Sequence, residues 1–343
     1  MGSLVSLSPL LLCVLFLLSS LPSPILSASV RCNPEDYKTL MRIKKSLNNP
    51  YHLASWIPNT DCCNWYCVEC DDNTNRITQF TIFQSNLSGQ IPAAVGDLPY
   101  LDTVVFRKLP NLYGSIPSSI TKLQNLKMLR LSWNNLSGPI PGFLGQLKNL
   151  EYLDLAFNRF SGQIPASLAD LSKLAALHLD RNRLTGAIPD SFGRFKVDTQ
   201  KSLYSGFYLY LSHNQLSGVI PKSLGEVNLI TVDVSRNKLV GDASVLFNPN
   251  GTTQTIDLSR NQFDFDLSGV KFPKTLIDLE LSHNIIRGSI PEEITGLELL
   301  QGLNVSYNRL CGQIPVGGNM NRFGYDSFFH NRCLCGQPLP NCK

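Results

Sequence analysis

Past residue 30, the sequence lacks any apolar run that approaches the roughly 18 to 20 residues needed to span a bilayer. It also lacks a basic stop-transfer cluster and a hydrophobic tail for a lipid anchor. The first thirty residues differ, because they carry no charged side chain and residues 10–18 are wholly apolar. Small residues follow at 27–29, as signal-peptide cleavage requires. We therefore expect residues 1–29 to be a secretory signal, and the mature chain to be extracellular without entering a membrane.

An excess of one charge sign is also missing. The chain has 30 lysines and arginines against 26 aspartates and glutamates, a formal net charge of +4. A nucleic-acid-binding protein concentrates basic residues on one face, so this balance argues against a nucleic-acid partner. A mild positive charge would suit loose retention by an acidic polysaccharide such as pectin.

Cysteine is absent from the long stretch between Cys70 and Cys311. The cysteines of the mature chain form a front cluster and a back cluster: Cys32, Cys62, Cys63, Cys67 and Cys70, then Cys311, Cys333, Cys335 and Cys342. Clusters at the two ends of an exported chain indicate disulfide-bonded caps. The spacing of Cys67 and Cys70 also suits zinc, but the oxidising compartment disfavours a metal site. Because the number is odd, we expect Cys67 or Cys70 to be unpaired.

A repeat of about 24 residues fills the middle of the chain. Residues 129–141 read Leu-Arg-Leu-Ser-Trp-Asn-Asn-Leu-Ser-Gly-Pro-Ile-Pro, and residues 153–165 repeat this pattern. Each copy has one asparagine at the same place, here called a framework asparagine: Asn134, Asn158, Asn182, Asn214, Asn237, Asn261, Asn284 and Asn308. Successive framework asparagines lie 23 or 24 residues apart, except for one interval of 32. Two looser copies at 80–92 and 104–117 bring the predicted number of repeats to ten.

The repeat predicts a stack of coils. Each Leu-x-Leu segment is a short strand with inward leucines, and the asparagine amide can bond backbone groups at the bend that follows. A single coil cannot bury its own apolar face, so the coils must stack. We expect an α/β solenoid, a right-handed superhelix of about ten coils with a concave parallel sheet. Its predicted parts are an N-terminal cap (30–76), the solenoid (77–315) and a C-terminal cap (316–343).

Two departures from the period predict local irregularity. The interval of 32 residues contains about eight extra ones around 196–206, which we expect to form a loop at the convex side or the edge. After Asn237 and Asn261 the Gly-x-Ile-Pro signature fades, so those two coils should be irregular. A helix over residues 36–47 should cover the first coil.

Two rows of side chains should face outward on the concave sheet. The residue between the two apolar strand residues of each coil forms the strand lane: Arg130, Asp154, His178, Tyr210, Asp233, Asp257, Glu280 and Asn304. The residue before each framework asparagine forms the turn lane: Trp133, Phe157, Arg181, His213, Arg236, Arg260, His283 and Tyr307. Exposed aromatic residues and arginines are typical anchors of protein interfaces, so we interpret this face as a binding surface. The alternative is a set of solvated residues whose charges pair across neighbouring strands.

A catalytic reading of the same face is disfavoured. Asp154, His178 and Asp180 lie on adjacent coils, and Ser132 or Ser212 is close in the pattern. Nucleophilic catalysis needs a sheltered site that orients base and nucleophile, which an open sheet does not offer. Both serines also belong to a recurring Leu-Ser-x-Asn frame. We therefore expect no enzyme activity, no cofactor and no metal.

Four sequons predict glycosylation, at Asn86, Asn135, Asn250 and Asn304. Because Asn304 belongs to the strand lane, a glycan there would obstruct one end of the concave face.

The repeat unit x-x-Leu-x-Leu-Ser-x-Asn-x-Leu-x-Gly-x-Ile-Pro resembles the plant extracellular leucine-rich repeat. Cap and irregular-coil motifs carry a more specific resemblance, to the polygalacturonase-inhibiting proteins of plant cell walls. These motifs are Cys32-Asn-Pro, Asp61-Cys62-Cys63, Gly96-Asp-Leu-Pro-Tyr100, Phe106-Arg-Lys-Leu-Pro-Asn-Leu112, Gly241-Asp-Ala-Ser-Val-Leu-Phe247, Leu303-Asn-Val-Ser-Tyr-Asn308 and His330-Asn-Arg-Cys-Leu-Cys-Gly336.

The resemblance implies a monomeric inhibitor of fungal endopolygalacturonases, secreted to the apoplast for defence, whose concave face docks on the enzyme's substrate cleft. Family acidic positions match Asp154, Asp180 and Asp233, and a family glutamine matches Gln254. With the neighbouring outward residues, the expected partner-binding set is Asp154, His178, Asp180, Arg181, Tyr208, Tyr210, His213, Asp233, Arg236, Gln254 and Asp257. The resemblance also implies the disulfides Cys32–Cys62, Cys63–Cys70, Cys311–Cys333 and Cys335–Cys342, which leave Cys67 free.

Two tyrosines depart from the family pattern. Tyr208 and Tyr210 stand where smaller residues are common, on the coil that carries the extra residues. This departure leaves the range of target enzymes open. The alternative functions are a wall-localised co-receptor that binds a peptide or protein, and an ice-binding relative without inhibitory activity. A charged and aromatic outward lane disfavours ice binding, which would favour a flat array of threonine or asparagine.

Overall fold

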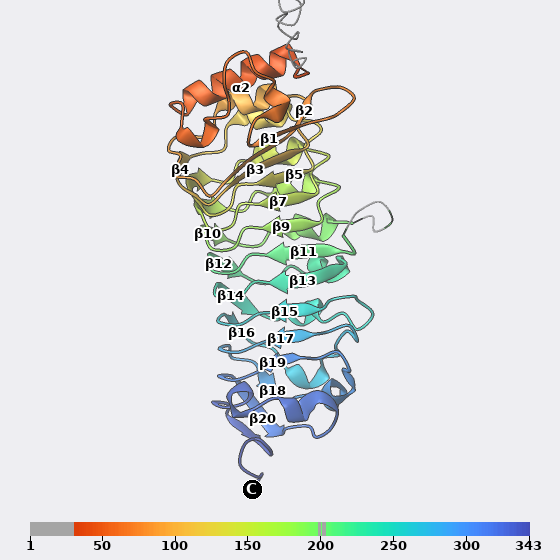
Figure 1. Cartoon of the computed structure of the whole chain (residues 1–343). Helices are drawn as coiled ribbons and strands as arrows, with labels where there is room; N and C mark the ends of the chain where they lie inside the picture. Colours follow the sequence, from red (N-terminus) through yellow and green to blue (C-terminus); the bar gives the residue numbers. More distant parts are fainter. Residues whose placement is uncertain (1–30, 198–199, 201–203) are drawn as a thin grey trace, which may run out of the picture.

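The computed structural model describes residues 31–197, 200 and 204–343. The predicted signal peptide and part of the extra segment (198–199 and 201–203) lie outside these residues. Within them, the chain coils into an elongated stack that runs from a helical cap at one end to the C-terminus at the other (Figure 1). No helix in the described part of the chain is both long and apolar enough to cross a bilayer.

The predicted solenoid is confirmed. Its largest sheet has eleven strands, of which β1 (Val68–Cys70) pairs antiparallel with β2 and the other ten run parallel in chain order. These ten are β2 (Ile77–Phe83), β3 (Thr103–Arg107), β5 (Met128–Arg130), β7 (Tyr152–Asp154), β9 (Ala176–His178), β11 (Phe207–Tyr210), β13 (Leu229–Asp233), β15 (Thr255–Asp257), β17 (Asp278–Glu280) and β19 (Gly302–Asn304). The inward leucines, such as Leu153 and Leu155, are fully buried and form one continuous core.

A second sheet, which sequence reasoning did not predict, lies beside the first. It has seven strands: β4 (Leu109–Gly114), β6 (Asn134–Pro139), β8 (Arg159–Gln163), β10 (Arg183–Gly186), β12 (Gln215–Gly218), β14 (Lys238–Gly241) and β16 (Gln262–Phe263). A three-stranded sheet of β18 (Arg287–Gly288), β20 (Arg309–Gln313) and β21 (Cys333–Cys335) continues it toward the C-terminus. Most of these strands begin at a framework asparagine or directly after it, where the repeat pattern predicts a bend.

Each coil returns through a short 3-10 helix. Nine of these helices close the solenoid coils: η3 (Ala93–Asp97), η4 (Ser118–Lys122), η5 (Gly142–Gln146), η6 (Ala166–Asp170), η7 (Asp190–Arg194), η8 (Lys222–Glu226), η9 (Ser244–Leu246), η10 (Leu267–Gly269) and η11 (Glu292–Gly296). Seven follow a proline, whose fixed φ suits the start of a helical turn. In η9 and η10 the Ile-Pro pair is missing and the helix shortens to three residues. The predicted irregularity of those coils is therefore confirmed.

The framework asparagines join neighbouring coils. Asn158 donates its amide to the carbonyls of Leu131 (2.8 Å) and Leu155 (3.1 Å), and its oxygen accepts from the Leu136 amide (3.0 Å). The amide thus pairs backbone groups that the bend would otherwise leave unsatisfied. Asn331, inside the C-terminal cap, makes the same three types of bond, so the coil geometry continues further than the repeat pattern indicated.

Disulfides close both caps. Helix α2 (Pro34–Ser46) covers the first coil, followed by η1 (Tyr51–Leu53) and η2 (Cys62–Asn64), while η12 (Gly318–Arg322) and η13 (Tyr325–Ser327) belong to the C-terminal cap. The four disulfides are the pairs that the resemblance implied: Cys32–Cys62, Cys63–Cys70, Cys311–Cys333 and Cys335–Cys342. Cys67 is the free cysteine among the described residues.

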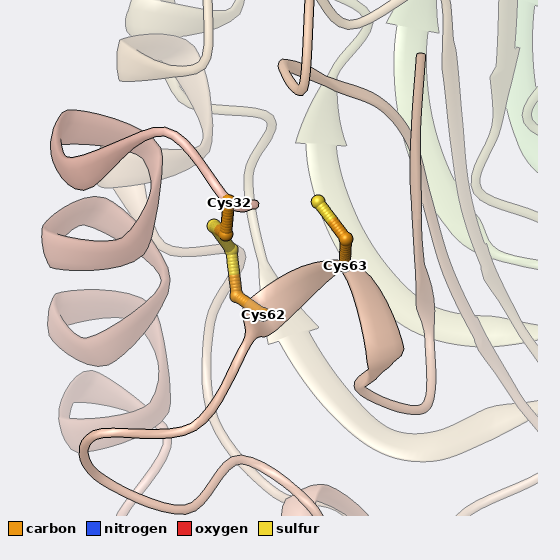
Figure 2. Close-up of side chains that lie close together, drawn as sticks. All are labelled: Cys32, Cys62 and Cys63. Carbon is orange, nitrogen blue, oxygen red and sulfur yellow. A yellow bond between two sulfur atoms is a disulfide. The ribbon is translucent and has the colours of Figure 1, made fainter. Parts of the chain in front are cut away.

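Three cysteine sulfurs of the N-terminal cap lie within 4.8 Å of one another, which is a spacing that a metal ion could bridge. Figure 2 shows two of them, from Cys32 and Cys62, joined in a disulfide with Cys63 nearby. Since Cys63 is itself bonded to Cys70, none of the three sulfurs is a thiolate. A disulfide sulfur does not replace the thiolate that a metal ligand requires.

Candidate functional site

The strand lane is a straight row across the concave sheet. Its eight residues, Arg130, Asp154, His178, Tyr210, Asp233, Asp257, Glu280 and Asn304, are direct register partners from β5 to β19. Neighbouring parallel strands lie about 4.8 Å apart, so adjacent side chains in the row contact one another. The row places three carboxylates, Asp233, Asp257 and Glu280, side by side.

Asp154 lies in the strand lane as predicted, but neighbouring side chains cover it, so it is not exposed to solvent. The residue is only 3% exposed. Its flanking register partners are the long Arg130 and the ring of His178, which cover it from both sides. One carboxylate oxygen accepts from Arg130 Nε (2.9 Å) and the other from the Ala156 amide (3.0 Å). Asp154 therefore holds Arg130 in place, and a partner could reach it only after displacing these contacts.

The two other aspartates of the lane also bond locally. Asp233 accepts from the amide (3.0 Å) and hydroxyl (2.7 Å) of Ser235, and Asp257 accepts from the Ser259 amide (2.9 Å). Asn304 accepts from Ser306 in the same way as Asp233 does from Ser235, at 3.0 and 2.7 Å. The side-chain oxygen of an uncharged asparagine thus accepts the same bonds, so these bonds do not require the negative charge of the aspartates.

Burial and mutual repulsion make several carboxylates hard to ionise. Burial raises the pKa of Asp180 to about 7, with further contributions from Asp154 and Asp233. Burial likewise raises the pKa of Glu280 to about 7, with contributions from Asp257 and Asp278. None of the ion pairs within the described part of the chain gives Asp180, Asp233, Asp257 or Glu280 a cationic partner. A cation from outside would relieve this crowding.

The turn lane has an unusual backbone. All eight of its residues have positive φ, between 53° and 61°, a region that large side chains seldom adopt. Backbone bonds to the next coil hold them there, for example from the Trp133 amide to the Ala156 carbonyl (3.0 Å) and from the Arg181 amide to the Ser212 carbonyl (2.8 Å). Sequence reasoning missed this conformation because glycine and asparagine are its usual signals. The constant position of these residues, directly before each framework asparagine, could have predicted this backbone conformation.

Aromatic and cationic side chains stack along the turn lane. Trp133, which is 44% exposed, stacks on Phe157 with ring centroids 3.6 Å apart, and the Arg181 guanidinium lies 4.9 Å from the Phe157 ring. Toward the C-terminus, Tyr307 stacks on His283 at 4.1 Å and on His330 at 4.5 Å. Such a ridge of exposed rings and cations is typical of binding surfaces.

The other predicted site residues lie on the same face. His213 and Arg236 belong to the turn lane, and burial lowers the pKa of His213. Burial also lowers the pKa of His178, whose ring stacks on Tyr210 with centroids 4.4 Å apart. Gln254 is exposed immediately before β15, three residues before Asp257 of the strand lane.

The serines considered as nucleophiles are inaccessible. Ser132 is 1% exposed and Ser212 is 5% exposed. A substrate could not reach either hydroxyl on the folded protein, which removes the nucleophile from the catalytic alternative.

The sequons differ in exposure. Asn86 and Asn250 are exposed, whereas Asn135 and Asn304 are half-buried. The Asn304 side chain already accepts two bonds from Ser306. Glycosylation of these four asparagines remains a prediction.

Comparison with known proteins supplies the family. Residues 33–71 match the family described as Leucine rich repeat N-terminal domain, and residues 124–184, 207–227 and 275–297 match leucine rich repeat families. The chain is 65% identical over 330 residues to a polygalacturonase inhibitor of Vitis vinifera, with 96% of each chain covered. It is 64% identical over 334 residues to polygalacturonase inhibitor 1 of Arabidopsis thaliana, with 97% of this chain and 98% of that protein covered.

A solved structure has the same architecture. A plant ice-binding protein superposes with a TM-score of 0.86 at 49% identity, covering 91% of this chain and 99% of that one. The matches to the inhibitors extend over nearly the whole chain and at higher identity. The resemblance expected from the cap motifs is thus confirmed, and the chain belongs to the polygalacturonase inhibitor family of leucine-rich-repeat proteins.

Proposed function

We propose that this protein inhibits fungal endopolygalacturonases as a secreted monomer of the plant cell wall, and that it uses its concave face to do so. The observation that carries the proposal is the row of Asp233, Asp257 and Glu280 on the open sheet. Burial raises the pKa of Asp257 and Glu280, and the charges of neighbouring carboxylates add to the effect. Such a surface favours a cationic partner over water.

The chemistry of the target matches this surface. Polygalacturonate is a polyanion, so an enzyme that cleaves it must hold its substrate with basic side chains. Carboxylates of the strand lane would pair with those side chains, and the aromatic residues of the turn lane would exclude water at the rim. The bound inhibitor then blocks substrate from entering the cleft, and it needs no chemistry of its own.

The charge of the row can be tested separately from its structural role. Asp233→Asn with Asp257→Asn should keep the local bonds, because Asn304 makes the same bonds to Ser306 in its own coil. We expect this variant to inhibit several fungal endopolygalacturonases about tenfold or more weakly than the wild type, since charge-assisted contacts contribute about 1.5 to 3 kcal/mol each. The measurement is reducing-sugar release from polygalacturonic acid, at low and at high salt.

A matched control changes net charge equally on another face. Glu292→Gln with Glu298→Gln alters two exposed residues in and beyond η11, and it should leave inhibition unchanged. Equal inhibition by the Asp233/Asp257 variant and the control would contradict the charge-pairing account. If the folded wild type inhibited no enzyme of a broad panel, the proposed function would be wrong, and a co-receptor role would become the better hypothesis.

Retention in the wall has a second candidate surface. The residue after the framework asparagine is basic in several coils, and Arg159, Arg183 and Lys238 are all exposed there. Together with Arg309 and Arg332 near the C-terminus they form what we call the basic face. Arg159 and Arg183 lie on successive coils, and the uncharged Gln215 separates them from Lys238. Cations repeated along one side of the stack suit a linear polyanion such as pectin. We propose that this face holds the inhibitor in the wall while the concave face remains available.

A further inference from the structure

The extra residues of the long coil end against the concave sheet. Tyr204 is the last tyrosine before β11, and its ring lies 6.1 Å from that of Tyr208, edge to face. Burial raises the pKa of Tyr204, and Glu151 and Tyr208 add to the effect. Tyr204 is therefore packed against the edge of the face that we propose to bind the enzyme.

Ala176 lies between the strands that carry Tyr152 and Tyr208, and larger side chains cover it. Ala176 is the register partner of Tyr152 on one side and of Tyr208 on the other. Although its side chain is only a methyl group on the concave face, Ala176 is 1% exposed. Larger neighbouring side chains must therefore close over it. The rings of Tyr152 and Tyr208 flank this position, and Tyr204 packs against Tyr208.

The rings continue into the strand lane. His178 lies 5.2 Å from the Tyr152 ring and stacks on Tyr210 at 4.4 Å. Five rings on three neighbouring coils therefore form one platform, here called the tyrosine surface: Tyr152, His178, Tyr204, Tyr208 and Tyr210. Each of the four tyrosines is half-buried, so none is enclosed in the core.

Asp233 and Asp180 lie near Tyr210 without an ion-pair partner among the described residues, whereas Asp154 beside Tyr152 is already bonded to Arg130. Burial raises the pKa of Tyr152 to about 12, and the neighbouring Asp154 contributes to the rise. Burial also raises the pKa of Tyr210, with a contribution from Asp233. Neutral rings with carboxylates beside them attract a cation, and a guanidinium group stacks on such rings particularly well.

We propose that the tyrosine surface receives an arginine or lysine side chain of the polygalacturonase and thereby determines which polygalacturonases are inhibited. This inference rests on the proposed function. Tyr204 belongs to the one interval between framework asparagines that departs from 23 or 24 residues, so it adds a contact that the regular coils do not supply. Tyrosine is also among the residues that most often dominate binding energy when they lie near the centre of an interface.

The test compares ring removal with hydroxyl removal. Tyr204→Ala and Tyr208→Ala should each weaken inhibition about tenfold or more for some enzymes of a panel and leave it unchanged for others. Tyr204→Phe and Tyr208→Phe should stay close to the wild type, because they keep the ring face that a cation contacts. Tyr113→Ala removes an exposed tyrosine from β4 of the second sheet and serves as the matched control. Thermal unfolding and circular dichroism establish that each variant is folded.

The outcomes separate this inference from the proposed function. If the wild type inhibits part of the panel and both alanine variants behave like Tyr113→Ala, the tyrosine surface plays no part in selection. An equal loss against every enzyme would also overturn the inference, since it would show general binding without selection. A loss as large for phenylalanine as for alanine would exclude ring stacking with a cation. Failure of the wild type against the whole panel would overturn both proposals.

Discussion

Asp180 occupies a position where every other coil from Ser132 to Ser306 carries serine or alanine. The carboxylate is half-buried there, within electrostatic reach of the acidic Asp154 and Asp233. Burial and these two neighbours disfavour its ionised form, which is why its pKa rises to about 7. An aspartate whose ionised form is disfavoured in this way is a better candidate for a functional residue than one on an open surface.

The raised pKa of Asp180 predicts a pH-dependent stability. In the unfolded chain the carboxyl group titrates near 3.8, whereas in the folded protein it titrates at about 7. Its contribution to the free energy of unfolding is therefore fully present below pH 3.8 and is lost as the pH rises through 7. Asp180→Asn cannot ionise, so its stability relative to the wild type should increase from pH 4 to pH 8 by about 1 to 2 kcal/mol, after allowance for solvent screening.

Urea unfolding of the wild type and Asp180→Asn at pH 4, 6 and 8 measures this difference. Glu298→Gln, an exposed carboxylate outside the concave face, is the control and should show no such trend. Parallel stability profiles for Asp180→Asn and the wild type would refute the assignment of the raised pKa to Asp180.

At the residue scale, the sequence predicted which side chains are neighbours better than it predicted how buried each one is. The period alone placed His178, Tyr210 and Asp233 in one row, because equivalent residues of stacked coils must be neighbours. It could not show that Asp154 is covered, since burial there depends on the length of the side chains on two adjacent strands. The family resemblance therefore indicated Asp154 as a binding position without indicating that its side chain is covered.

At the element scale, one buried ion pair holds the N-terminal cap in addition to its two disulfides. Asp36 in α2 is 1% exposed and accepts from Arg76 Nε (2.8 Å), Arg76 Nη2 (2.7 Å) and the Ile77 amide (3.0 Å). The Arg76 guanidinium also lies 4.2 Å from the ring of Tyr100 in the following coil. This arrangement ties the helix to the first strand and to the next coil, which a helix packed only by Leu40 and Ile43 would not achieve.

Removing the arginine should loosen the cap. Arg76→Ala leaves the Asp36 carboxylate buried without its cation, and we expect the free energy of unfolding to fall by about 3 to 5 kcal/mol. Lys38→Ala breaks the exposed pair with Glu35 in the same helix (2.8 Å) and should cost less than about 1 kcal/mol. Chemical unfolding of both variants, with limited proteolysis to locate early opening, distinguishes the two. A small and equal effect of both substitutions would show that the disulfides alone hold the cap.

The elements themselves were predictable to different degrees. The helix expected over residues 36–47 is present as α2, and it ends one residue earlier than predicted. It begins two residues earlier because Pro34 is favoured in a first helical turn and Asn33 caps it. The second sheet was not predicted, since strands as short as Gln262–Phe263 have too few residues to show an alternation of apolar and polar side chains. Only the stacking of coils aligns such segments into a ladder.

At the scale of the whole molecule, a small net charge conceals two surfaces of opposite character. The acidic part of the strand lane belongs to the large parallel sheet. Arg159, Arg183 and Lys238 of the basic face belong to the seven-stranded sheet, and the turn lane separates the two along the chain. A net charge of +4 would suggest weak and diffuse attraction to a polyanion. The arrangement in the fold instead concentrates cations on one side, which composition alone could not reveal.

This separation predicts that retention by pectin and inhibition of the enzyme can be altered independently. Arg183→Glu with Lys238→Glu reverses two exposed charges of the basic face without touching the concave sheet. The variant should elute from immobilised polygalacturonate at lower salt, and its binding should be roughly tenfold weaker or more, because exposed ion pairs contribute up to about 1 kcal/mol each. Its inhibition of fungal endopolygalacturonases should be unchanged.

Lys173→Glu with Lys222→Glu makes the same charge change on other exposed residues and should affect neither property. If inhibition and retention fell together in the Arg183/Lys238 variant, the two functions would share one surface. The proposal that the basic face binds pectin while the concave face binds the enzyme would then be wrong.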